Sequence, residues 1–121
     1  MGHQAVSRVV GAAMEEAAAS HLVECGYRVI ERNYHSRFGE IDIVAADGDT
    51  LVFVEVKYRK AGSLVSPLES LTREKARRIR LTVRQYLGRR GVDCRVPVRV
   101  DLCVVTDNGR SLQVLPGVVE F

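Results

Sequence analysis

The sequence has no tryptophan, only three prolines and 6% aromatic residues, so surfaces for aromatic stacking are scarce. Its three cysteines are odd in number and nowhere spaced as CxxC, which argues against a disulfide framework and against a zinc site. No apolar run approaches the roughly 18 residues that cross a bilayer. The first residues also lack the charged-then-apolar pattern of a secretory signal. We therefore expect a soluble domain with reduced thiols in the cytoplasm.

What the sequence does contain is enough for one folded unit. A chain of 121 residues with 46% hydrophobic and 27% charged residues is typical of a globular domain and too short for two sizeable cores. There is no internal repeat, low-complexity tract or interior linker. We predict a single domain over residues 1–121, with about residues 1–5 as a flexible tail.

Positive charge is concentrated in one segment. The formal net charge is only +3, yet the segment between Arg73 and Arg90 holds eight basic residues and one acid, Glu74. The rest of the chain has 10 basic and 14 acidic residues. This segregation predicts a polyanionic partner, with a solvated helix face as the alternative interpretation. The candidate nucleic-acid-binding residues of this segment are Arg73, Lys75, Arg77, Arg78, Arg80 and Arg84.

The hydrophobic spacing predicts an α/β domain with the element order α-β-β-β-α-β-β. Met14, Ala18 and Leu22 recur at i, i+4 spacing, which indicates a first helix over residues 5–25. Thr72 and Ser66-Pro67 are candidate helix starts, and Asn108-Gly109 is a candidate turn. An antiparallel hairpin joined by a helical crossover to a later strand implies a mixed sheet. Strands are expected at residues 27–34, 40–46, 51–58, 99–106 and 112–115, and the second helix at about 72–87.

The turn at residues 47–49, Asp-Gly-Asp, decides which side chains of the hairpin meet. A two-residue turn at Gly48-Asp49 places Asp42 directly across from Glu55. A turn at Asp47-Gly48 places Asp42 opposite Phe53, still on the face of Glu55. A three-residue loop would move Asp42 to the face of the strand's valines, which burial disfavours.

Two acids and a lysine of this hairpin are candidates for catalysis. Glu55 and Lys57 alternate with valines, so they share one face of their strand. Opposed carboxylates with β-carbons about 4.5–5.5 Å apart repel unless one is protonated or a cation lies between them. Mg²⁺ prefers such oxygen ligands, and Lys57 could stabilise charge on a phosphate, which indicates metal-assisted phosphodiester hydrolysis. The alternative is a structural ion pair, Asp42–Lys57 or Glu55–Lys57.

Other polar residues have two interpretations each. Glu15 borders the core face of the first helix, so it is either a further acid of the site or an exposed helical acid. Arg99 and Asp101 share a strand face, and we expect a buried ion pair near the site rather than catalytic groups. The four tyrosines could stack on bases, but core or rim packing is the stronger expectation for each.

The ordered set of these segments resembles the YraN-like bacterial proteins, which are placed in the PD-(D/E)XK nuclease superfamily near the Holliday junction resolvases. The resemblance runs from about Gly11 to Thr106 and includes Glu15, Lys75 and the arginines that follow it. Its most specific pieces are residues 37–42, Arg-Phe-Gly-Glu-Ile-Asp, and residues 52–57, Val-Phe-Val-Glu-Val-Lys.

The resemblance implies a restriction-endonuclease-like core and a role for each site residue. Asp42 and Glu55 resemble the metal-binding acids, Lys57 the catalytic lysine, and Glu15 the additional acid of the first helix. The carbonyl of Val56 resembles the backbone metal ligand of the superfamily. The implied cofactor is Mg²⁺ or Mn²⁺, the implied partner is DNA, including branched DNA, and the implied assembly is a homodimer.

Residues and resemblance together predict a metal-dependent endonuclease that hydrolyses DNA phosphodiester bonds. The Arg73–Arg90 helix and the Arg59–Ser66 loop, with Arg59 and Lys60, would grip the phosphate backbone without reading bases. The first alternative is a nucleic-acid-binding module that keeps the nuclease fold without hydrolysis. A second alternative is a protein-interaction domain that presents the basic helix to an acidic partner.

Overall fold

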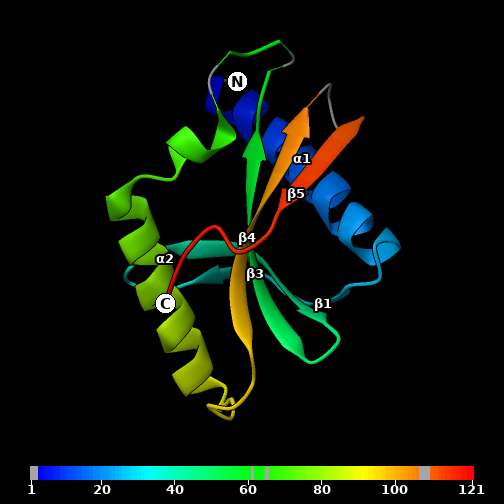
Figure 1. The fold of residues 1–121 in the computed structure, drawn as a ribbon. Coiled ribbons are helices and arrows are strands. Elements are labelled where there is room, and N and C mark those ends of the chain that lie inside the picture. The colour runs from blue at the N-terminus through cyan, green and yellow to red at the C-terminus, as the bar shows by residue number, and fades with distance from the viewer. Residues whose placement is uncertain (1–2, 61, 65, 107–109) are drawn as a thin grey trace.

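A computed structural model describes residues 3–60, 62–64, 66–106 and 110–121, and the predicted order of elements is confirmed (Figure 1). The helix α1 begins at His3. Residues 1–2 and the predicted Asn108-Gly109 turn lie outside the described residues. The elements are α1 (His3–Glu24), β1 (Arg28–His35), β2 (Glu40–Asp47), β3 (Thr50–Tyr58), the 3₁₀ helix η1 (Pro67–Ser70), α2 (Arg73–Arg89), β4 (Val98–Thr106) and β5 (Ser111–Leu115).

The strands form one mixed sheet in the order β1-β2-β3-β4-β5. β3 and β4 are parallel because α2 returns the chain to the same end of the sheet, while the other neighbours are antiparallel. The two long helices lie against opposite faces, so the sheet is the middle of three layers (Figure 1). Within the described ranges, neither helix is long and apolar enough to cross a membrane.

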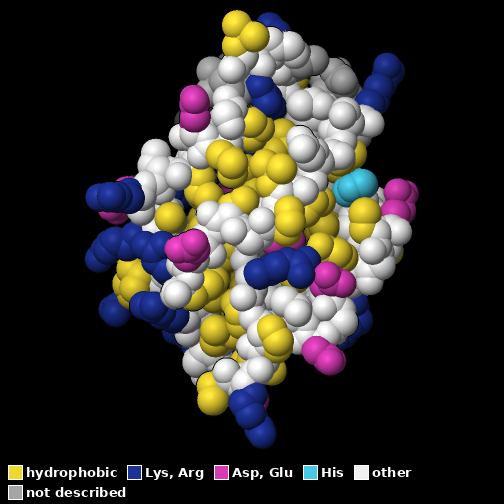
Figure 2. Space-filling model, in the orientation of Figure 1, with side chains coloured by type: hydrophobic (Ala, Val, Ile, Leu, Met, Phe, Trp, Pro, Cys, Tyr) yellow, Lys and Arg dark blue, Asp and Glu magenta, His cyan; other side chains and the backbone are white. Residues whose placement is uncertain are grey.

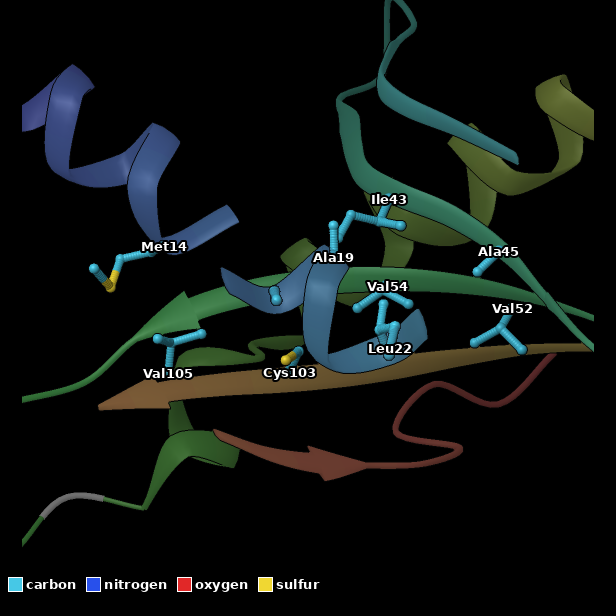
Figure 3. Packing of buried hydrophobic residues seen from close by; sticks show 10 residues of the cluster. Met14, Ala19, Leu22, Ile43, Ala45, Val52, Val54, Cys103 and Val105 are labelled. Carbon is cyan, nitrogen blue, oxygen red and sulfur yellow. The ribbon is translucent and has the colours of Figure 1, made fainter. Parts of the chain in front are cut away.

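The face of the sheet beneath α1 is closed by small and branched side chains. Ala18 and Leu22 of α1 are fully buried there, as the predicted i, i+4 stripe requires. Figure 3 shows Leu22 packed over the sheet. Cys103 also lies in this layer, and burial raises the pKa of its thiol to about 11, so the group packs as a hydrophobic side chain. We call this the α1 cluster: Met14, Ala18, Ala19, Leu22, Ile43, Ala45, Val52, Val54, Cys103 and Val105.

The opposite face packs against α2 and contains the aromatic residues of the core. Phe53 meets Tyr86 edge-on at 5.3 Å, and Tyr34 meets Tyr86 at 5.0 Å. Ile79, Val83 and Tyr86 are buried on the inner face of the helix, which leaves its arginines toward solvent. We call this the α2 cluster: Tyr34, Ile41, Val44, Leu51, Phe53, Ile79, Val83, Tyr86, Val100 and Val119.

A buried ion pair lies at the Asp47–Thr50 end of the hairpin. Asp101 is fully buried, and Arg99 donates from Nε to its Oδ1 at 3.0 Å and from Nη2 to Asp47 at 3.1 Å. The predicted Arg99–Asp101 pair is therefore confirmed, but it lies at the opposite end of β2 from Asp42. Asp101 also accepts the amide hydrogen of Gly117 at 3.1 Å, which fixes the C-terminal segment against the sheet.

The edge strand β1 is irregular in two places. Its pairing with β2 shifts register between Val29 and Glu31. Asn33 has a φ of 56°, a left-handed conformation that non-glycine residues seldom adopt. Tyr34 and Arg32 pair with Ile41 and Ile43, so Asn33 stands beside the middle of β2, where Asp42 lies.

The start of α2 is fixed by Thr72, whose Oγ1 accepts the amide hydrogen of Lys75 at 3.1 Å. Thr72→Ala removes this cap and is expected to lower the free energy of unfolding by about 1 kcal/mol. Chemical denaturation measures the change, and Thr72→Ser, which keeps the hydroxyl, should recover most of it. A loss in the serine variant equal to that in the alanine variant would contradict the capping role.

Candidate functional site

The hairpin of β2 and β3 closes with one of the two predicted two-residue turns. Asp47 pairs with Thr50, so Gly48 and Asp49 form the turn, and Gly48 takes a φ of 59° there. The regular pairing of the two strands then continues as far as Ile43 and Val54. Of the two registers that burial had left open, the structure has the one whose extension aligns Asp42 with Glu55.

The regular pairing of β2 and β3 ends at Ile43 and Val54. Beyond that point the side chain of Asp42 lies between the two strands. Asp42 Oδ2 accepts the amide hydrogen of Val56 at 2.7 Å. The carboxylate thus satisfies a backbone donor of β3 at the point where regular pairing ends. We call this point the strand split, and both candidate acids lie at it.

β2 is twisted at the strand split, and this twist changes which face Asp42 reaches. Ile41 and Ile43 are two residues apart, yet Ile41 belongs to the α2 cluster and Ile43 to the α1 cluster. Regular alternation would place both on one face. The left-handed Asn33 stands beside this position in β1, so both strands are irregular here.

Asp42 consequently lines a hollow on the α1 side of the sheet, of about 240 Å³. Glu15 of α1 and Val56 of β3 line the same hollow, together with Tyr58. Three of the four residues predicted as metal ligands are therefore brought together: Asp42, Glu15 and Val56. Glu15 is also within 3.5 Å of Arg32, whose shorter ion pair, at 2.7 Å, is with Glu16. We call this the acid hollow.

Glu55, the fourth predicted ligand, lines a different hollow of about 450 Å³ on the α2 side. The expectation that Asp42 and Glu55 share one face is therefore wrong, because the twist of β2 breaks the alternation on which it depended. Glu40 lines this second hollow, and Lys75 of α2 pairs with Glu55 at 3.0 Å. No single group of three His, Cys, Asp or Glu side chains suited to a metal ion occurs among the described residues.

The two acids still influence each other across the strand split. Burial, followed by the negative charge of Glu55, raises the pKa of Asp42 to about 7, against the opposing hydrogen bond from Val56. The charges of Glu15 and Glu40 act in the same direction. Burial also raises the pKa of Glu55, and the ammonium of Lys75 partly offsets this. Negative charge is therefore concentrated at the split without an equal number of cations.

This crowding makes stability depend on pH in a defined direction. Because the pKa of Asp42 is higher in the folded chain, protonation favours folding, and this contribution is lost as the pH rises through about 7. Asp42→Asn keeps an acceptor for Val56 and should raise the free energy of unfolding at pH 8 by about 1–3 kcal/mol. The gain should shrink steadily toward pH 4.

Urea unfolding of both proteins between pH 4 and pH 8.5 measures this difference. Asp49→Asn is the matched control, because Asp49 is an exposed acid in the hairpin turn. A pH-independent difference for Asp42→Asn, or the same profile in both variants, would contradict the crowding.

Lys57 lies on β3 two residues after Glu55, and its charge lowers the pKa of that acid. It is half-buried, and no acid among the described residues lies within ion-pair distance of it. The structural ion pairs considered for Lys57 are therefore absent from this part of the chain. Sequence reasoning instead missed the pairing of Glu55 with Lys75, because the docking of α2 on the sheet leaves no local signal.

Basic side chains gather over α2 on one side of the molecule (Figure 2). Arg78 is paired with Glu74 on the exposed face at 3.3 Å, and Lys75 with Glu55. Arg90 is paired with Glu31 at 2.8 Å and covers the rings of two tyrosines, so it has a structural role. Four of the predicted binding residues on α2 have no acidic partner within the described ranges: Arg73, Arg77, Arg80 and Arg84.

A known protein family matches the part of the chain that contains these features. The profile described as "Uncharacterised protein family UPF0102" matches residues 14–105, which include both helices' core faces and the whole hairpin. The chain belongs to the UPF0102 family.

Individual UPF0102 relatives are similar over much of the chain. A UPF0102 protein of Rhodococcus jostii is 49% identical over 78 residues, covering 64% of this chain and 66% of the relative. One of Chromohalobacter salexigens is 43% identical over 100 residues, covering 83% and 80%. One of Marinobacter nauticus is 42% identical over 105 residues, covering 87% and 85%. The chain thus spans just under two thirds of the Rhodococcus relative.

Proposed function

We propose that this UPF0102 protein is a metal-dependent endonuclease that hydrolyses phosphodiester bonds of DNA. The observation that carries the proposal is the strand split, where the charge of Glu55 helps to raise the pKa of Asp42 and Lys57 follows Glu55 by two residues on β3. Excess negative charge beside an unpaired lysine is costly to maintain for folding alone. It suits a site that receives both a cation and a phosphate.

The acid hollow has the donor chemistry of a hard divalent cation. Asp42, Glu15 and Val56 offer only oxygen ligands there, and the raised pKa of Asp42 reflects charge that a cation would relieve. Mg²⁺ or Mn²⁺ bound by these groups would supply charge to neutralise the attacked phosphate. Glu55 adds its field from the other side of β3, and Lys57 would stabilise charge developing on a phosphate oxygen.

The basic face of α2 would hold the nucleic-acid backbone beside the strand split. Lys75 and Arg78 line the hollow of Glu55, so the helix and the acids adjoin. The unpaired arginines Arg73, Arg77 and Arg84 are exposed along the same helix. Contacts of this kind bind phosphates without reading base sequence, so shape, including that of branched DNA, would select the substrate.

A nucleic-acid-binding module without hydrolysis is the second candidate, and one observation favours it. The ammonium of Lys75 already neutralises Glu55 at 3.0 Å, as expected where no cation is needed. In this case the basic face of α2 alone would bind the nucleic acid. The negative charges around Asp42 would then only lower the stability of the fold.

Incubation of supercoiled, linear and four-way-branched DNA with Mg²⁺, with Mn²⁺ and with a chelator tests the proposal. We expect cleavage that requires the metal, is abolished in Asp42→Asn, and persists in the control Asp49→Asn. Binding without cleavage in either metal would overturn the endonuclease and support the binding module. Absence of both binding and cleavage would overturn both candidates.

The proposed setting is the cytoplasm, where the exposed thiols of Cys25 and Cys94 stay reduced. By its resemblance to the resolvases we also propose a homodimer, which light scattering at several concentrations tests. A monomer mass at all concentrations would refute the dimer without affecting the proposed hydrolysis.

A further inference from the structure

A third hollow, of about 440 Å³, lies where β3 ends and η1 begins. One wall is formed by the three basic residues that follow Glu55 in the chain, namely Lys57, Arg59 and Lys60. The hydroxyl-bearing residues Ser66 and Ser70, which flank η1, line it as well. We call it the cation hollow.

The charges of this hollow are unbalanced. Lys57, Arg59 and Lys60 have no acidic partner within ion-pair distance among the residues described. The lining contains one acid, Glu69, which is exposed. Like charges that converge on a concave surface raise the local concentration of anions. The folded chain therefore maintains a hollow whose lining has three cations against one exposed acid.

Hydrogen bonds hold the walls of the cation hollow in place. The guanidinium of Arg59 donates from Nη2 to the carbonyl of Ser63, which ties this cation to the loop after β3. Ser66 Oγ accepts the amide hydrogen of Leu68 at 3.3 Å. Its hydroxyl hydrogen can still rotate and donate to a bound acceptor. A tetrahedral anion with several acceptor oxygens matches cations and a hydroxyl that surround one space.

The cation hollow adjoins the acid hollow, because Tyr58 lines both. The acid hollow, which suits a cation, and the cation hollow, which suits an anion, are thus neighbours at Tyr58. An acidic peptide would bring carboxylates next to Glu15 and Asp42 and be repelled. A nucleic-acid strand presents repeated phosphates, of which one can lie in the cation hollow while a neighbour approaches the acids through a bound dication.

We propose that the cation hollow binds one phosphate group of a nucleic-acid strand and so sets which bond lies at the strand split. The role in choosing the bond rests on the proposed function. Binding of a phosphate to the hollow needs neither a divalent metal nor cleavage. The phosphate is either a terminal monoester or an internal diester, and both are the same chemistry for Arg59, Lys60 and Ser66.

The first test is titration of the full chain with inorganic phosphate, followed by amide NMR at constant ionic strength and without divalent metal. We expect saturable shifts at residues 57–60 and 66–70, with chloride giving none. Lys60→Ala should weaken phosphate binding about fivefold. The matched control Arg28→Ala removes an exposed cation of β1, which pairs with Ala46 near the hairpin turn, away from this hollow.

The second test uses short single strands with and without a 5′ phosphate, again without divalent metal. A 5′ phosphate that strengthens binding in the wild type but not in Lys60→Ala assigns the hollow to a strand end. Equal binding of both strands, weakened by Lys60→Ala and not by Arg28→Ala, assigns it to an internal phosphate.

Three outcomes overturn the proposal. Inorganic phosphate shifts no amide of the hollow, or the two alanine variants lose affinity equally, or an acidic peptide of equal charge binds as well as the strand. Because none of these readouts involves hydrolysis, failure of the endonuclease proposal leaves them interpretable.

Discussion

Lys57→Met is expected to lower the rate of DNA cleavage at saturating DNA by about 10²–10³-fold, the loss typical of removing one preorganised electrostatic group. Lys57 is half-buried on β3, close enough to Glu55 to lower the pKa of that acid. Methionine keeps an unbranched stem of similar length, so packing should survive while the charge is lost. Single-turnover cleavage measures the chemical step apart from binding.

The control for this variant is Lys57→Arg, which keeps the charge and should retain part of the activity. DNA affinity should change by less than about threefold in Lys57→Met, because the exposed arginines of α2 supply most phosphate contacts. Cleavage by Lys57→Met at the wild-type rate would remove the lysine from the proposed mechanism. Loss of affinity equal to the loss of rate would assign Lys57 to binding alone.

Asp101→Ala is expected to lower the free energy of unfolding by about 3–5 kcal/mol, as is usual when one partner of a buried ion pair is removed. Asp101 is fully buried and accepts from Arg99 Nε at 3.0 Å and from the amide of Gly117 at 3.1 Å. The alanine leaves the Gly117 donor without this partner and Arg99 with Asp47 as its remaining anion.

Urea unfolding measures this loss, and a double-mutant cycle with Arg99→Met identifies its cause. If the penalty comes from an uncompensated charge, the double variant should be more stable than Asp101→Ala alone. A single-variant loss below about 1 kcal/mol, the range of an exposed pair, would contradict a structural role for the buried carboxylate.

Much of this fold could be predicted because its local signals agree. The burial of the valines of β3 disfavoured a three-residue loop and left two possible turns, and the structure has the one at Gly48-Asp49, which aligns Asp42 with Glu55. The spacing of Met14, Ala18 and Leu22 likewise indicated the first helix, and all three are buried.

The candidate site was harder to predict from the sequence, because two of its features depend on contacts between different elements of the fold. The twist between Ile41 and Ile43 breaks the period-two alternation from which the shared face of Asp42 and Glu55 was inferred. The Lys75–Glu55 pair depends on how α2 docks on the sheet, since these residues are 20 positions apart in the chain. The acid hollow likewise forms only when α1 meets β2 and β3, which are distant from it in sequence.

The irregular edge of β1 also affects how the protein behaves at high concentration. An outermost strand with a straight, continuous row of amide and carbonyl groups can recruit strands from other molecules and start aggregation. The register shift after Val29 and the left-handed Asn33 interrupt that row twice within eight residues. The opposite border of the sheet, β5, is only five residues long. Neither border therefore provides a long template, and the protein should resist polymerising into fibres when crowded.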